Sequence, residues 1–265
     1  MKKTLIRGVI AAVLLLVLAV WFFFFRGDTP DAVDVEAANE QLDADLAAAA
    51  AAADDDNAAA DGEADDDAGE ATEATPDFDG DVNGRWIVDD EIGDFDFETA
   101  SGSFAGFRVD EELTIGEVVA VGRSGGVSGS LTIEANQLVA ADLTVDMTTI
   151  VSNDSRREGA IRGAVGASTH PTATFVLTEP VTLPAGLATG ETVAVDAVGD
   201  LTVNGVTNST TFTINALVRD DGFGVITGST NIVFEDFDVT APSAAIVVSV
   251  DDNGIVEFQL IVAKG

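Results

Sequence analysis

The stretch GDLTVNGVTNSTTF, residues 199–212, decides the fold class of this protein. Leu201 and Val203 alternate with polar residues, and a second run rich in β-branched residues follows Asn204-Gly205. Asn-Gly is the preferred pair at the centre of a type I′ turn, where both residues need a positive φ. The stretch therefore predicts a β-hairpin that places Leu201 and Val203 on one face of a sheet.

The same period-two alternation recurs throughout residues 81–265, between clusters of Gly, Asp and Asn. It is seen in SLTIEA (130–135) and DLTVDM (142–147), and it flanks DDNG (251–254), which predicts a second hairpin with its turn there. One segment, SNDSRREGAIRGAVG (152–166), has a helical pattern, with Ser152 or Asn153 as its N-cap. Many short antiparallel strands and one short helix are typical of an all-β barrel or sandwich.

Residues 1–26 predict a transmembrane signal-anchor. No residue from 8 to 25 is charged, and three basic residues precede that run. The apolar length approaches the ~20 residues that cross a bilayer, and the basic flank predicts a cytoplasmic N-terminus with the following domain extracytoplasmic. A cleaved signal peptide is the alternative, but four phenylalanines and Arg26 stand where a small-x-small cleavage site belongs.

Residues 27–80 contain 19 acidic residues and no basic ones. Such low hydrophobicity and high charge predict a disordered Ala/Asp/Glu-rich linker. Because alanine favours helix, the alanine run is compatible with a transient helix around 46–53. An acidic partner-binding tail is the functional alternative to a solvated spacer.

Composition excludes several classes of function. The net charge is −35, so phosphate-rich nucleic acid is not an expected partner, and no cysteine is present for a thiolate nucleophile or Cys-ligated zinc. The single histidine, His170, precedes a proline, and no G-x-S-x-G motif accompanies it. DGDVNGRWIVDD (79–90) matches part of the calcium-loop pattern, but a predicted strand replaces the flanking helix. We therefore expect no enzyme, no cofactor and no metal site.

GDLTVNGVTNSTTF resembles the signature hairpin of the YceI-like, polyisoprenoid-binding family. Three further stretches resemble family segments and follow in the family's order: WIVDDEIGDFDFE (86–98) with GSFAGF (102–107), TTIVSNDSRREGAIR (148–162) with the Arg157-Glu158 pair, and HPTATF (170–175). The resemblance spans residues 85–263. Glu158 stands where the family usually has aspartate, His170 where it has an aromatic residue, and AVGAS (164–168) where it has paired phenylalanines.

The resemblance implies an extended, lipocalin-like antiparallel β-barrel of about eight strands over residues 81–265, whose apolar interior holds an isoprenoid or other long-chain lipid. It implies no catalytic residues. The simplest phase of the alternation turns nine apolar side chains inward as ligand-binding residues: Leu131, Ile133, Leu143, Val145, Phe175, Leu201, Val203, Phe212 and Ile214.

The leading interpretation is therefore a membrane-tethered, extracytoplasmic lipid-binding barrel. The alternative is an interaction or structural module of the cell envelope, with a filled barrel and no ligand. A hydrolase and a calcium-regulated barrel are further alternatives with weaker support in the sequence.

Overall fold

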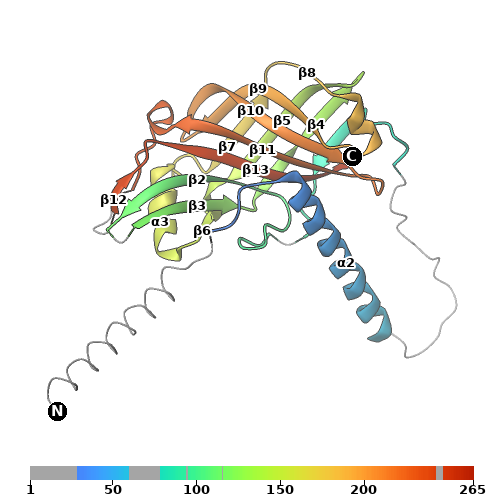
Figure 1. The fold of residues 1–265 in the computed structure, drawn as a ribbon, viewed down its shortest axis with the longest axis horizontal. Coiled ribbons are helices and arrows are strands. Elements are labelled where there is room, and N and C mark those ends of the chain that lie inside the picture. The colour runs from blue at the N-terminus through green and yellow to red at the C-terminus, as the bar shows by residue number, and fades with distance from the viewer. Residues whose placement is uncertain (1–28, 60–77, 94, 115, 243–246) are drawn as a thin grey trace, which may run out of the picture.

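The computed structural model describes residues 29–59, 78–93, 95–114, 116–242 and 247–265. Two α-helices, three 3-10 turns and thirteen strands lie in this part of the chain (Figure 1). In chain order they are α2 Val35–Ala59, β1 Gly84–Val88, β2 Phe104–Leu113, β3 Gly116–Ser124, β4 Val127–Glu134, β5 Gln137–Asp146, η1 Met147–Thr149, β6 Val151–Ser152, α3 Ser155–Ala164, β7 Thr172–Leu177, β8 Val181–Thr182, η2 Ala185–Thr189, β9 Val193–Val203, β10 Val206–Val218, β11 Phe223–Val233, η3 Phe234–Phe237, β12 Val247–Val250 and β13 Asn253–Lys264.

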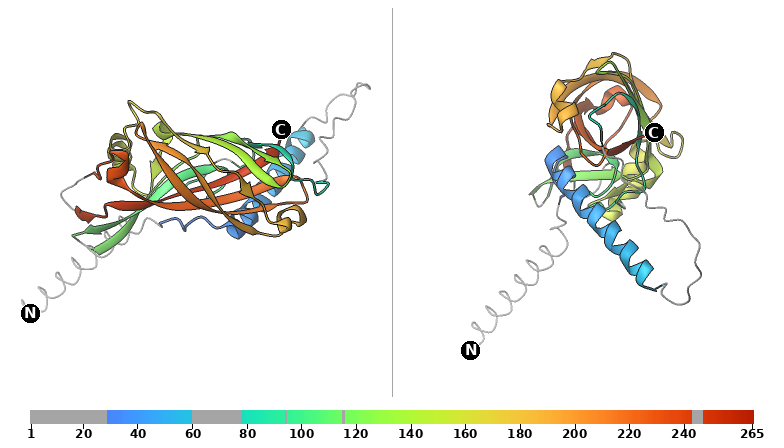
Figure 2. Two further views of the ribbon diagram at one scale, coloured as in Figure 1. Left: turned by 90° about the horizontal axis from the view of Figure 1, so that it is seen from above. Right: turned by 90° about the vertical axis from the view of Figure 1, so that its right-hand side faces the viewer.

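Eight antiparallel strands form a closed barrel, as the family resemblance implies. Their order is β1-β4-β5-β7-β9-β10-β11-β13, and the pairing of β13 with β1 closes the ring (Figure 2). The nine side chains predicted to face inward are all buried or half-buried members of the barrel core, so the predicted phase of the alternation is confirmed.

Strand β13 changes partner along one edge. Its first part, Ile255–Gln259, pairs with β2, and its last part, Val262–Lys264, pairs with β1. Strands β2, β3, β6 and β12 therefore extend the sheet beyond the closed ring at one end of the barrel, where α3 also lies (Figure 1). This extension creates a wall that is not part of the eight-stranded ring.

The hairpin that the opening stretch predicts is confirmed. Val203 pairs with Val206 across a two-residue loop, and φ is +52° at Asn204 and +76° at Gly205, as a type I′ turn requires. The ring of His170 lies over Gly205, so the segment before β7 packs on this turn. The Asn-Gly pair is therefore part of the scaffold.

Replacing Gly205 by alanine is expected to destabilise the protein by about 1–3 kcal/mol, because alanine is strained at this φ. The added Cβ would also lie 2.4 Å from Cε1 of His170. Urea unfolding of both proteins measures the difference. Adding His170→Ala removes the clash but not the strained φ, so the double variant should recover part of the loss; a double variant no more stable than Gly205→Ala would contradict the ring contact.

The hairpin predicted at 251–254 is wrong. Strand β12 does not pair with β13; both pair with β2, β12 through Val247–Val250 and β13 from Ile255 onward. The amide of Asp251 donates to the carbonyl oxygen of Asp110 on β2, at 3.0 Å, so the interrupted strand continues along the same partner. The DDNG sequence therefore interrupts one continuous stretch of pairing with β2 and does not reverse the chain.

The disordered linker predicted for residues 27–80 is also wrong over Val35–Ala59, which form the helix α2. The side chain of Asp34 accepts a hydrogen bond from the amide of Ala37, at 3.0 Å, and so caps the helix. Three apolar side chains near the N-terminal end of α2 are buried against the outside of the barrel: Val35, Ala38 and Leu42. Tertiary burial therefore stabilises a segment whose composition alone predicts disorder.

The predicted short helix is confirmed as α3, although it begins at Ser155 rather than directly after Ser152 or Asn153. Asn153 instead bonds to the edge of β3, donating to the carbonyl oxygen of Val119 at 3.3 Å. In the described ranges, no helix is long and apolar enough to cross a membrane. The predicted anchor at 1–26 lies outside those ranges.

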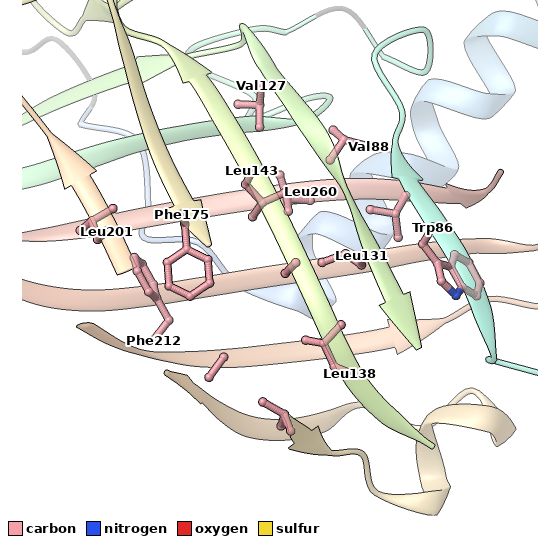
Figure 3. Close-up of a cluster of buried hydrophobic side chains, with 14 of the residues drawn as sticks. Trp86, Val88, Val127, Leu131, Leu138, Leu143, Phe175, Leu201, Phe212 and Leu260 are labelled. Carbon is pink, nitrogen blue, oxygen red and sulfur yellow. The ribbon is translucent and has the colours of Figure 1, made fainter. Parts of the chain in front are cut away.

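The two ends of the barrel interior differ. At the end nearest β1 the interior is filled by large side chains, among them Trp86, Leu131 and Leu138 (Figure 3). The indole nitrogen of Trp86 donates to the carbonyl oxygen of Val82, at 2.9 Å, so this buried ring has its polar atom satisfied. The candidate site lies toward the other end.

Candidate functional site

A cavity of about 280 Å³ lies inside the barrel, toward the end that carries α3 and the β2–β3 extension. This is near the lower end of the ~300–1,000 Å³ typical of ligand pockets. Its lining is apolar apart from Glu111, Arg157, Thr174 and Glu257. The cavity is partly open rather than sealed, so it is accessible from outside without unfolding the barrel.

Small side chains leave the space empty. Ala105 and Gly106 on β2, Ala120 on β3 and Ala173 on β7 line the cavity where larger residues would fill it. The helix α3 continues this wall with the small side chains of Ala160 and Ala164, beside Ile161 and the following Val165. Where the family usually has paired phenylalanines, this chain therefore has residues that leave room.

Three phenylalanines form the inner part of the cavity. The rings of Phe175 and Phe212 are 5.2 Å apart between centroids, and those of Phe212 and Phe258 are 5.5 Å apart (Figure 3 shows the first two). Each outer ring lies over a glycine of a neighbouring strand, Phe175 over Gly199 and Phe258 over Gly228. A Cβ at Gly199 would lie 2.4 Å from Cζ of Phe175, so the first glycine of the opening stretch makes room for a cavity residue.

Six of the nine predicted ligand-binding residues line this cavity: Leu143, Val145, Phe175, Leu201, Val203 and Phe212. Leu131 and Ile133 belong to the buried core but are not among the lining residues, and Ile214 is half-buried against that core. Alternation along a strand identifies the inward face but does not indicate which part of that face meets empty space.

Sequence reasoning missed the residues from outside the ring. The wall contributed by α3, by Val109 and Ala120 of the extension, and by Val239, Ala241 and Pro242 was not predicted. A signal for α3 was present, because Ala160, Ile161 and Ala164 recur at helical spacing and so share one face.

An ion pair fixes α3 at the cavity. Nη1 of Arg157 lies 2.8 Å from Oε2 of Glu111 on β2, and both side chains line the cavity. One turn further along, Arg162 donates to the carbonyl oxygen of Ile150 at 2.9 Å and lies 3.6 Å from Glu158. The Arg157-Glu158 pair noted in the sequence is therefore split between two different partners.

The remaining candidate sites do not assemble. His170 is exposed and packs on Gly205, and no cluster of three potential metal ligands occurs in the described ranges. The carboxylate of Asp81 accepts hydrogen bonds from the backbone and side chain of Asn83, mainly the backbone one, and these lower the pKa of Asp81. Strand β1 begins at Gly84, inside the stretch that matches part of the calcium-loop pattern, so that stretch does not form such a loop.

Three solved structures are similar to this chain. A polyisoprenoid binding domain from Saccharophagus degradans, implicated in plant cell wall breakdown, is 21% identical; the match covers 68% of this chain and 98% of that one, with a TM-score of 0.52. BcnA of Burkholderia cenocepacia is 21% identical over 60% and 95% of the two chains, with a TM-score of 0.47. The YCEI protein of Campylobacter jejuni is 16% identical over 54% and 84%, with a TM-score of 0.43.

Among curated proteins, none is similar enough to match this chain. The first of the three structures supports the barrel fold, and the YceI-like domain as a family matches residues 95–262, well over half of the chain. That range includes the opening stretch and all nine side chains predicted to face inward. The protein belongs to the YceI-like domain family.

Proposed function

We propose that this protein binds an isoprenoid or other long-chain lipid in the cavity beside α3. The observation that carries the proposal is an open, almost wholly apolar cavity at the end of an otherwise filled barrel. The similar domain from Saccharophagus degradans is described as polyisoprenoid binding, which supports the same class of ligand here. A filled envelope module, the alternative, would not need this space.

The apolar lining is enough to explain affinity for a lipid chain. Enclosing a hydrocarbon chain is favourable by ~0.8 kcal/mol per CH₂ before entropy costs. Aromatic rings of Phe175, Phe212 and Phe258 give the inner part of the cavity a large apolar contact area. Among the polar lining residues, the Arg157–Glu111 pair is available to the polar end of the ligand.

We further propose that residues 1–26 anchor the protein in a membrane, with the barrel on the extracytoplasmic side. The apolar run and its basic flank support this arrangement. Because Pro30 and Asp31 already contact the barrel through Arg108 and Arg123, only a few residues separate the anchor from the folded domain. The barrel would therefore sit close to the bilayer that supplies its ligand.

A direct binding experiment tests the proposal. Residues 29–265, which include α2 and the barrel, are titrated with a fluorescent long-chain isoprenoid alcohol and with its two-unit analogue. We expect saturable one-to-one binding of the long chain and at least roughly ten-fold weaker binding of the short one, because fewer methylenes are enclosed. A folded protein that binds neither probe would contradict the proposal.

A further inference from the structure

An N-terminal strap, residues 30–46, crosses the outside of the barrel wall that encloses the cavity (Figure 1). Its extended first part contacts three strands in turn. Arg108 of β2 donates to the carbonyl oxygen of Pro30, Arg123 of β3 donates to that of Asp31 at 2.7 Å, and the amide of Val33 donates to Oε2 of Glu257 on β13 at 3.3 Å. Side chains of the wall thus bind the backbone of the strap.

The charged groups beneath the strap form one buried network. Glu257, whose side chain is 1% exposed, lies 2.9 Å from Nε of Arg108 and 2.9 Å from Nη2 of Arg123. The guanidinium of Arg123 also lies 4.4 Å from the ring centre of Phe104, as a cation–π contact. The strap therefore covers charges that would otherwise face water.

The second part of the strap, the start of α2, docks through apolar side chains. Val35, Ala38 and Leu42 pack in one cluster with Leu217, Val225 and Ile261. Polar contacts flank this cluster: Arg219 donates to Asn39 and to Asp43, each at 2.7 Å, and Ser101 donates to Asp45 at 2.8 Å.

The strap also covers the place where β13 changes partner. Ile261 lies between the part of β13 that pairs with β2 and the part that pairs with β1. There its amide donates to the side-chain oxygen Oγ of Ser103, at 3.0 Å, and its carbonyl oxygen accepts from the amide of Asp89, at 2.8 Å. Its side chain is 1% exposed because the strap lies over it.

The cavity and the strap lie on opposite faces of the same strands. Along β13, Phe258 lines the cavity. Its neighbour Glu257 also borders the cavity, but the carboxylate of Glu257 pairs with Arg108 and accepts a hydrogen bond from the strap. Along β2, Val109 lines the cavity while its neighbour Arg108 holds the strap. Successive side chains of a strand point to opposite faces. A movement of β13 or β2 therefore moves both the cavity lining and the strap contacts.

We propose that the docked strap clamps the β13–β2–β3 wall and thereby retains the ligand in the cavity. Undocking of the strap loosens the wall at the partner change of β13 and speeds release of the lipid. The inference rests on the proposed lipid-binding function, but the strap contacts themselves do not. The strap lies outside residues 95–262, which match the family model. The proposal gives this segment a role in how long the barrel retains its ligand.

The test uses the full chain in detergent, with Leu42→Asp and the control Ala48→Asp. Leu42 of the strap is fully buried against the barrel, whereas Ala48 is exposed on the same helix. The two variants therefore add the same charge at a buried and at an exposed position. Hydrogen–deuterium exchange of residues 35–46 reports docking, and transfer of a preloaded fluorescent isoprenoid alcohol to acceptor vesicles reports release. We expect faster exchange and roughly ten-fold faster release for Leu42→Asp only, as for local opening of one structural unit.

The possible results distinguish failure of the strap proposal from failure of the proposed lipid binding. Faster exchange with unchanged release would overturn the clamp, and unchanged exchange in Leu42→Asp would overturn the docking. If the unsubstituted protein takes up no lipid while exchange still responds to Leu42→Asp, the proposed function fails and the strap contact stands. Should Leu42→Asp not fold, Asp43→Ala loosens the strap by removing its bond from Arg219, which keeps its pair with Asp221 outside the strap, and gives the same comparison.

Discussion

Replacing Glu257 by alanine is expected to destabilise the folded protein by about 3–5 kcal/mol, because it leaves buried guanidinium groups uncompensated. The side chains of Arg123 and Glu257 are each 1% exposed, and Arg108 is 12% exposed. Burial lowers the pKa of Arg123, while its hydrogen bond with Glu257 opposes that shift. An arginine guanidinium is effectively always protonated in proteins, so the cost falls on folding. Urea unfolding at pH 7 measures the loss.

A matched control distinguishes the cost of leaving buried charges unpaired from the cost of lost packing. Arg108, Arg123 and Glu257 are all replaced by methionine, which removes every charge of the network together. Such replacements are often neutral or stabilising in other proteins, so we expect the triple variant to be more stable than Glu257→Ala. A Glu257→Ala variant within about 1 kcal/mol of the unsubstituted protein would match an exposed ion pair instead and would contradict the burial of this network.

Replacing Val203 by tryptophan is expected to weaken lipid binding roughly 50-fold while leaving the barrel folded, because an indole ring that displaces about three ligand methylenes removes about 2.4 kcal/mol. Val203 lines the cavity near the end of β9. The long-chain titration described above measures the loss. Because overpacking itself costs stability, the melting temperature of the variant is measured in parallel.

The neighbouring residue supplies the control for this substitution. Thr202 lies on the same strand but faces outward, where its hydroxyl contacts that of Thr207 at 2.8 Å. Thr202→Trp adds the same ring without entering the cavity and should bind lipid normally. Equal loss of binding in the two variants would contradict the position of the cavity, and undiminished binding in a folded Val203→Trp protein would contradict its use by the lipid.

The sequence predicts most of the barrel because its strands are locally consistent. Asn204-Gly205 fixes one turn through its positive φ values, and alternation fixes which side chains face inward. A prediction from local sequence fails at 251–254, where turn-forming residues interrupt the pairing with β2 and do not reverse the chain. That outcome depends on pairing with β2, more than one hundred residues earlier in the chain, which no local pattern reports.

The strap is the clearest case in which composition misleads. Residues 27–80 are acidic and poor in large apolar residues, yet Val35, Ala38 and Leu42 are spaced so that they share one face of a helix. Three apolar residues are too weak a signal to predict a docked helix by themselves. The surface that receives them comes from β10, β11 and β13, and it exists only once the barrel has formed.

The cavity was only half predictable for a related reason. Alternation finds inward residues, but the empty space depends on which facing residues are small, such as Ala120 on β3 and Ala173 on β7. These positions come together only through the pairing order of the strands and the placement of α3.

The most direct test of the account is mass spectrometry of the lipid extracted from the protein as it occurs in its own membranes. The full chain and its Val203→Trp variant are purified from the native membrane fraction, washed free of bulk lipid, and extracted with organic solvent. The account predicts a near-stoichiometric isoprenoid or other long-chain lipid with the unsubstituted protein and its loss from the variant. An empty, folded protein that also takes up no added lipid would contradict it.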